Sequence, residues 1–256
     1  MQPVGEQKPI GFSRLGVSRP LTWPEQTALI RALKHLGNRE YELMHYTALL
    51  TGARMPTVLT LRWGAFTTPP NQLSDWLVEL PCGPGTGVDT PGDVKGVTLA
   101  IPKELYEWLH EYAISDRAKA RRAKSPLKQD PRNYLFLSNQ GGAYYESKDD
   151  RDHPLVGAKL KRSSATGQNL RTFITEHVIP EVRKTIPGFH YQFNDLRATC
   201  GVNWAESIRK QDDSYAHYLW ARERMGQRLW HTSLATTDQY FQYQGREAYP
   251  GPNVDT

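Results

Sequence analysis

The segment "HTSLATTDQYFQY", residues 231–243, carries a histidine and a tyrosine nine positions apart near the end of a basic chain. Two interpretations of Tyr240 are open: a reactive phenol, or an aromatic side chain packed beside Phe241. Thr236 and Gln239 have the spacing of a capping box, which would start a short helix here and place Tyr240 early in it. The rest of the sequence is needed to choose between them.

Composition sets wide bounds on function. The chain has 256 residues, a formal net charge of +5 and a pI of about 9.1, which indicates a polyanionic partner without determining the fold. Its length suits one large domain or two small ones. Two cysteines, Cys82 and Cys200, are too few for a disulfide framework, so a reducing, cytoplasmic setting is expected. We find no run of about 18 apolar residues to span a membrane and no apolar signal-peptide core.

Helix signals dominate the first third of the chain. In "LTWPEQTALIRALKHLG", Thr22 and Glu25 form a capping box, Pro24 suits the first turn, and Gly37 ends the helix. A second helix is expected over about 41–50. A short third helix should carry Val58, Leu59 and Leu61.

Strands are expected only in the middle of the sequence. "DWLVEL" (75–80) and "GVTLAI" (96–101) read as strands joined by a long Gly/Pro loop, and "NYLFLS" (133–138) as another. Residues 102–113, 168–182, 194–208 and 214–230 are predicted to be helical, the last as one helix or two. The sequence therefore predicts a mainly helical α+β domain with a small antiparallel sheet, without the alternation of a doubly wound fold.

Several kinds of chemistry have no signature here. The sequence contains no Gly-rich phosphate loop, no HExxH motif and no CxxC pair, and its eight histidines lack metal-ligand spacing. We therefore expect no cofactor and no metal.

Three segments together resemble the tyrosine recombinase (phage integrase) family. "TGARMPTVLTLRW" (51–63) matches its first box, Thr-Gly-x-Arg before a Leu-rich helix that ends in Leu-Arg-Trp. "NDLRAT" (194–199) corresponds to the box His-x-Leu-Arg-x-Thr. "LWHTSLATTDQY" (229–240) corresponds to Leu-Gly-His, two small residues, Thr-Thr and a tyrosine. Their shared order and spacing are fairly specific, and the resemblance covers about 21–243.

The resemblance implies the DNA breaking-rejoining fold and a site-specific recombinase that needs neither metal nor ATP. A tyrosine attacking a phosphodiester increases the negative charge on the phosphoryl oxygens, and two arginines can stabilise that charge. The resulting 3′-phosphotyrosine conserves the bond energy for rejoining. By this resemblance, Arg54 and Arg197 hold the phosphate, His231 hydrogen-bonds it and Tyr240 is the nucleophile. The His231 spacing favours Tyr240 over Tyr243.

The family also uses a lysine on its strand hairpin as a general acid, and Lys95 is the lysine in the corresponding loop, although its register is a few residues late. Asn194 stands where the family has His or Lys, so by the resemblance it takes that catalytic position here. The alternative is a purely structural role as a helix N-cap. His190 is a nearby substitute. Thr57 replaces an acidic residue near the first arginine, and Trp230 replaces a glycine.

Basic residues elsewhere could contact DNA phosphates, although such runs are usually solvated faces. The candidates are Arg117, Arg121, Arg122, Lys124, Lys159, Lys161 and Arg162. The resemblance implies double-stranded DNA as partner, a homo-tetramer on DNA with a monomer left open in its absence, no membrane, and a bacterial or phage-encoded origin.

Other interpretations of the same residues stay open. Arg54 and Arg197 could be ordinary helix-end arginines, and His231 a partly buried structural histidine. A non-catalytic DNA-binding or regulatory module of the same fold, or a type IB topoisomerase-like enzyme, would share these features. We expect a tail or linker over 1–20, the catalytic domain over 21–243 and a C-terminal tail over 244–256.

Overall fold

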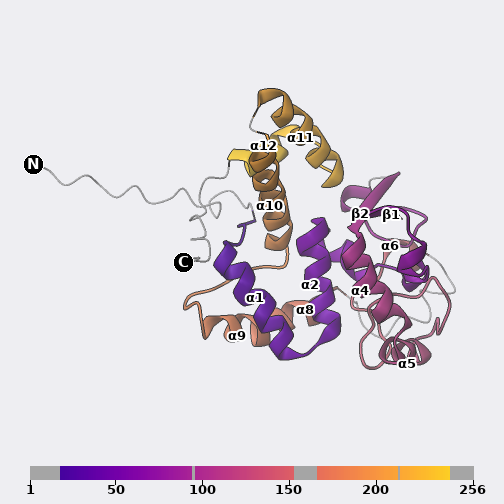
Figure 1. Ribbon diagram of the computed structural model, residues 1–256. Helices are drawn as coiled ribbons and strands as arrows, with labels where there is room; N and C mark the ends of the chain where they lie inside the picture. Colours follow the sequence, from indigo (N-terminus) through magenta and orange to yellow (C-terminus); the bar gives the residue numbers. More distant parts are fainter. Residues whose placement is uncertain (1–17, 94–95, 153–165, 213, 243–256) are drawn as a thin grey trace, which may run out of the picture.

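The computed structural model describes residues 18–93, 96–152, 166–212 and 214–242 (Figure 1). Helices predominate, and the sheet has two strands. The longer elements in chain order are α1 (Trp23–Leu36), α2 (Arg39–Thr51), α3 (Met55–Leu59), β1 (Leu77–Cys82), β2 (Val97–Pro102), α4 (Lys103–Ile114), α5 (Asp116–Lys124), α6 (Lys148–Asp152), α8 (Gln168–Phe173), α9 (Ile179–Arg183), α10 (Asp195–Gln211), α11 (Tyr215–Arg228) and α12 (Leu234–Gln242).

The first helix begins and ends as its sequence predicts. The Thr22 hydroxyl accepts from the Glu25 backbone N–H, and the Glu25 carboxylate accepts from the Thr22 N–H, so the capping box is confirmed. Gly37 ends the helix in the left-handed region at φ 65°. α2 follows at once and is buried along most of its length, which makes it the central helix of the larger core.

The hairpin forms two residues later in β1 and one residue later in β2 than the sequence patterns suggest. Leu77 pairs with Pro102 and Cys82 with Val97 in an antiparallel register. The Lys103 N–H donates to the Trp76 carbonyl at 2.9 Å and closes the open end of the hairpin. The register is set by pairing between two separate segments, which the pattern within each segment does not determine.

The expected strand over 133–138 is an extended, buried segment with isolated bridges. Tyr134 pairs with Arg62 and Leu137 with Ala143, but no continuous ladder forms. The side chains of 134–137 are all buried, so the segment lies inside the core with both faces covered. The apolar content of this segment made it resemble a strand, whereas in the structure its side chains pack in the core without a paired strand.

One predicted helix contains an interruption. The stretch over 168–183 runs as α8, a π-helical turn (Ile174–Val178) and α9. Pro180 has no N–H to donate to the carbonyl of Glu176 four residues earlier, which accounts for a wider turn just before it.

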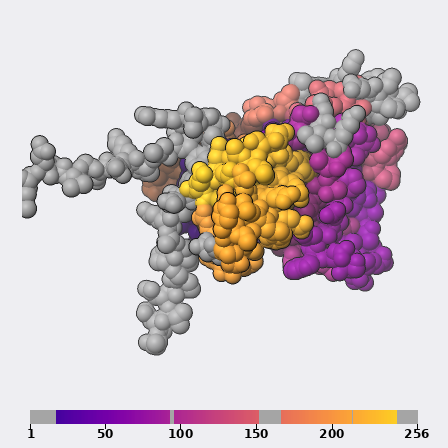
Figure 2. Space-filling model, turned by 90° about the horizontal axis from the view of Figure 1, so that it is seen from above, coloured from indigo at the N-terminus to yellow at the C-terminus, as the bar shows by residue number. Residues whose placement is uncertain are grey.

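The three C-terminal helices form a second core beside the first. α10 packs against both α2 and α12, and therefore connects the two cores (Figure 1). Seen from above in Figure 2, the surface of α10–α12 (orange to yellow) lies directly beside that of the hairpin region (purple). The three segments that carry the sequence motifs meet where these cores join.

Candidate active site

Arg54 lies at the junction between α2 and α3. Gly52 ends α2 in the left-handed region at φ 71°, and its N–H donates to the Ala48 carbonyl. The chain then turns so that Arg54 precedes α3 with its side chain exposed. Within the described residues the Arg54 guanidinium makes no hydrogen bond, so it is free to take an anionic ligand.

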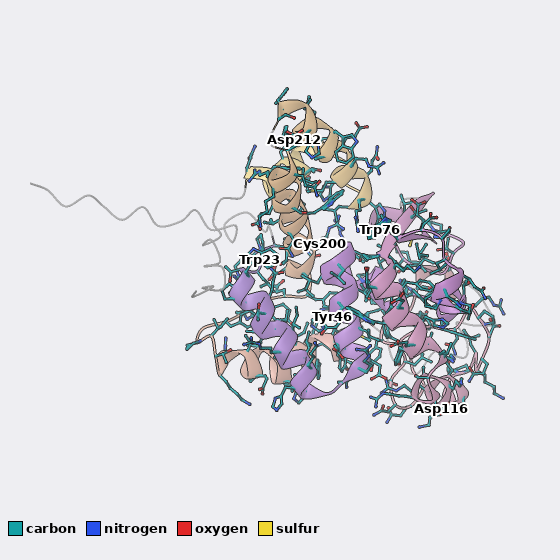
Figure 3. All side chains as sticks on the ribbon, in the orientation of Figure 1. Trp23, Tyr46, Trp76, Asp116, Cys200 and Asp212 are labelled. Atoms are coloured by element: carbon teal, nitrogen blue, oxygen red, sulfur yellow. The ribbon has the colours of Figure 1, made fainter. Side chains whose placement is uncertain are left out.

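Arg197 lies in the first turn of α10 and is only 5% exposed. One guanidinium nitrogen donates to the Gly52 carbonyl at 2.7 Å, and the other terminal nitrogen donates to the Leu229 carbonyl. Burial lowers its pKa, and the electrostatic effect of the nearby Tyr240 oxygen opposes that shift. A single side chain therefore joins the ends of α2 and α11 to α10. Figure 3 marks this junction by the labelled Cys200, three residues further along α10.

His231 occupies the turn between α11 and α12. Its backbone N–H donates to the Gly226 carbonyl at 2.8 Å, and its Nδ1 lies 2.8 Å from the Thr237 hydroxyl oxygen. Burial lowers the pKa of His231 to about 4, with further lowering by Arg197 and Arg54, so the imidazole is neutral at pH 7. Its Nε2 is buried without a hydrogen-bond partner among the described residues.

Tyr240 lies on the inward face of α12 and is 8% exposed. Its ring centroid is 5.6 Å from that of His231, with 32° between the planes. Burial raises the pKa of Tyr240, and the positive charges of Arg197 and Arg54 partly offset that rise. The Tyr240 ring packs in the second core together with Phe241, as one of the opening interpretations expected, and the reactivity of its phenol stays a prediction.

The predicted capping box at Thr236 and Gln239 is wrong. α12 begins at Leu234, and the Ser233 hydroxyl accepts from the Ala235 N–H at 3.2 Å. Tyr240 therefore lies in the second turn of the helix.

Arg54, Arg197, His231 and Tyr240 thus come from distant parts of the chain to one region. Both arginines act to lower the pKa of the imidazole and of the phenol, which requires all four groups to be close. Two guanidiniums, a neutral imidazole and a protonated phenol form a site suited to an oxyanion. The sequence segments that supply them are the ones that carry the family resemblance.

Comparison with solved structures identifies the fold. XerH site-specific recombinase in its pre-cleavage complex with difH substrate matches 88% of this chain at a TM-score of 0.53 and 16% identity. Its post-cleavage complex with palindromic difH matches 90% of this chain at a TM-score of 0.50 and 16% identity. The fold is that of a tyrosine recombinase catalytic domain. A lambda integrase (75–356) dimer on a COC′ core site matches 90% of this chain, and 62% of its own, at 0.45 and 16%.

The chain spans about half the length of the XerH structures, 50% and 51% of those chains. No protein-family model matches the sequence. No curated protein matches it either. No helix in the described part of the chain has both the length and the apolar character needed to cross a membrane. Nor do the described residues contain a group of three or more His, Cys, Asp or Glu side chains that could hold a metal ion.

Three positions where the sequence departs from the tyrosine recombinase motifs have structural explanations. Asn194 does not cap α10: its backbone is helical and its side-chain amide donates to the Ser18 hydroxyl at 2.6 Å, which corrects the cap prediction. Thr57 is buried and donates to the Asp89 carbonyl at 2.7 Å, so it holds the loop after β1. Trp230 has φ 52°, a conformation in which glycine is unstrained.

Trp230 also connects the site to the hairpin of this tyrosine recombinase fold. Its indole N–H donates to the Thr98 carbonyl on β2 at 3.0 Å. His190 is exposed, and its carbonyl accepts from Arg19. Lys95 and Tyr243 lie outside the described residues.

The basic segment in α5 serves the interior, which corrects part of the predicted DNA contacts. Arg117 donates to both carboxylate oxygens of the buried Glu40, at 2.7 and 2.8 Å. Arg121 is 6% exposed and donates to Leu137 and Asn139, and Arg122 is 2% exposed and lies over the Trp63 ring. The buried guanidiniums of Arg121 and Arg122 are therefore not available to a phosphate backbone, whereas the Arg117 side chain is 51% exposed.

Lys124 is exposed, and its ammonium donates to the Asn139 carbonyl at 2.9 Å. The predicted contacts Lys159, Lys161 and Arg162 lie outside the described residues.

The structure also adds residues that sequence reasoning missed. Thr237, Gly201 and Gly226 surround the His231–Tyr240 pair, and none was assigned a role from the sequence. The adjacent threonines of the third box were the available signal for Thr237. The two glycines gave no signal, because their importance depends on which ring or helix lies opposite.

Proposed function

We propose that this chain is the catalytic domain of a tyrosine recombinase, which cuts and rejoins double-stranded DNA through a 3′-phosphotyrosine intermediate. Arg54 and Arg197 bind the scissile phosphate, His231 donates a hydrogen bond to it, and Tyr240 attacks the phosphorus. The observation that carries this proposal is the convergence of these four groups, with both arginines acting electrostatically on the imidazole and the phenol.

The chemistry follows from the charges. The Tyr240 oxygen forms a bond to phosphorus while the bond to the 5′ oxygen of the next nucleotide breaks, and the phenolic proton passes to solvent. The arginines stabilise the negative charge that grows on the non-bridging oxygens. Lys95, by the family resemblance, would protonate the leaving 5′ oxygen. The reverse reaction rejoins the strand, so no nucleotide is consumed.

DNA is the proposed partner because the site suits a phosphodiester and the chain carries a net charge of +5. The related XerH structures are described as bound to their difH substrates. Assembly of four copies on DNA is the expectation that the resemblance provides.

Covalent trapping on selected duplexes tests the proposal and needs no defined target sequence. A pool of duplexes with a randomised core is first enriched for binding to the full chain. Nicked versions of the enriched duplexes, from which the released fragment diffuses away, are then incubated with the protein. We expect a detergent-resistant protein–DNA adduct that disappears in Tyr240→Phe and persists in Tyr215→Phe, whose exposed ring lies on α11.

A non-catalytic DNA-binding module is the alternative, and the engagement of Asn194 with Ser18 favours it. That alternative predicts salt-sensitive binding to the enriched duplexes with no adduct from the unmodified protein. Relaxation of supercoiled DNA without sequence preference would instead indicate a topoisomerase-like enzyme. A covalent adduct that persists in Tyr240→Phe would exclude Tyr240 as the nucleophile.

A further inference from the structure

The contact between Thr237 and His231 bears on which ring nitrogen of the neutral imidazole carries the proton. Thr237 is fully buried on the inward face of α12, one turn before Tyr240. Its hydroxyl oxygen lies 2.8 Å from Nδ1 of His231. Among the described residues, this nitrogen is the only hydrogen-bond partner of the Thr237 hydroxyl.

Glycine at position 226 leaves room for the contact. A Cβ atom at Gly226 would lie 3.2 Å from the Thr237 hydroxyl oxygen and 3.1 Å from Leu234. The same Gly226 carbonyl accepts the His231 backbone N–H at 2.8 Å. α11 thereby places the imidazole and lets the hydroxyl approach it, so the pair is held from both sides.

The hydrogen-bonding groups of Thr237 and His231 favour one tautomer of the imidazole. A neutral imidazole has one N–H and one acceptor nitrogen. If Nδ1 carried the proton and donated to Thr237, both the threonine O–H and the Nε2 acceptor would be buried without partners. If Thr237 donates to Nδ1, the lone pairs of its oxygen and the Nε2–H are without partners. Each arrangement therefore leaves one donor and one acceptor unused, but the second places the unused donor at Nε2, where an anionic oxygen would pair with it, which favours the second arrangement in a site that binds an anion.

We propose that Thr237 is a positioning residue that donates its hydroxyl proton to His231 Nδ1 and so keeps the imidazole proton on Nε2. This inference rests on the proposed function for its catalytic meaning. With the proton on Nε2, the buried, unpaired nitrogen is a donor for an anionic phosphate oxygen. In the opposite tautomer it would present a lone pair and repel that oxygen.

Nitrogen NMR of the full chain labelled with ¹⁵N-histidine tests the tautomer without DNA or activity. His231 signals are assigned by their loss in His231→Gln. We expect Nδ1 to resonate as an unprotonated nitrogen and Nε2 as a protonated one. A protonated Nδ1 in the unmodified chain would overturn the proposal.

Substitutions at position 237 separate the effect of the hydroxyl group from the effect of side-chain shape. Thr237→Val keeps the shape and removes the donor, and should give a mixture of tautomers. Thr237→Ser restores the donor and should restore the single tautomer. The matched control is Thr236→Val, because Thr236 is the exposed neighbour on the same helix and should leave the signals unchanged. An unchanged His231 spectrum in Thr237→Val would refute the positioning role.

Adduct formation in a single turnover supplies the second readout. Thr237→Val should slow it about ten-fold, the loss of roughly one hydrogen bond, and Thr237→Ser should recover most of the rate. The two readouts separate the proposals. A correct tautomer without any adduct from the unmodified protein would reject the recombinase function, whereas an adduct with the wrong tautomer would reject only the role of Thr237.

Discussion

Gly201 of α10 lies against the ring of Tyr240 on α12, and a Cβ atom at position 201 would be 2.8 Å from Tyr240 Cδ2. Real Cβ contacts are almost never that short, so the bare glycine backbone forms one wall of the space that holds the phenol. The position of the proposed nucleophile therefore depends on the absence of a side chain in another helix.

Gly201→Ala should displace the Tyr240 ring and reduce covalent adduct formation by at least ten-fold. Alanine favours the helix interior by about 0.5–1 kcal/mol, which offsets part of the clash, so the free energy of unfolding should change little. Ser207→Ala, at an exposed position on the same helix, is the matched control for both measurements. Normal adduct formation in Gly201→Ala would show that the ring position tolerates movement.

Trp230 combines a strained backbone with a useful side chain. Trp230→Gly relieves the positive φ but loses the indole bond to Thr98, whereas Trp230→Ala loses that bond and keeps the strain. We expect the glycine variant to be more stable than the alanine variant by about 1 kcal/mol in urea unfolding. Equal midpoints for the two variants would mean that position 230 carries no backbone strain.

Arg117 should matter for stability and not for DNA binding. Arg117→Gln removes the bidentate partner of the buried Glu40 and should lower the free energy of unfolding by about 2 kcal/mol. The salt dependence of DNA affinity should stay the same, since no phosphate contact is lost. Lys119→Gln, an exposed position on the same helix, is the control. A salt slope reduced by about one, with unchanged stability, would restore Arg117 as a DNA contact.

Two histidines should make stability depend on pH. The folded chain lowers the pKa of His45 and of His231 to about 4, in both cases chiefly by burial, from an ordinary value of 6.5. The unfolded chain therefore binds more protons between these values, so stability is full above pH 6.5 and falls as pH decreases toward 4. Urea midpoints measured from pH 7.5 to 4.5 should show this fall.

His231→Gln should weaken the pH dependence, because it removes one of the two contributing groups, while His45 continues to contribute. His35→Gln is the control, because the His35 side chain is 71% exposed. Identical pH profiles for the unmodified chain and His231→Gln would show that His231 titrates alike in both states.

Local chemistry predicted the ends of the first helix. The capping box at Thr22 and the left-handed glycine at 37 depend on residues within one turn, whereas the caps expected at Thr236 and Asn194 failed. The extended segment around Tyr134 instead takes its form from core neighbours on both faces. Local pattern could not distinguish it from a strand.

The same distinction applies to the site. Arg54, Arg197, His231 and Tyr240 were identified by resemblance in the motifs, and the structure brings them together. The burial of Arg121 and Arg122 could not be foreseen, because a basic run has the same composition whether it faces solvent or the interior. Nor does sequence indicate which glycine lies opposite Tyr240.

The two carbonyl contacts of Arg197 have an evolutionary consequence. This guanidinium ties the ends of two helices together, so losing it weakens the folded chain as well as any catalysis. If the chain cuts DNA as proposed, a decaying copy of the gene that has lost this activity would still be selected to keep Arg197 as long as its product must fold. In such remnants the arginine would persist after the tyrosine had drifted away, and only the tyrosine would report a working enzyme.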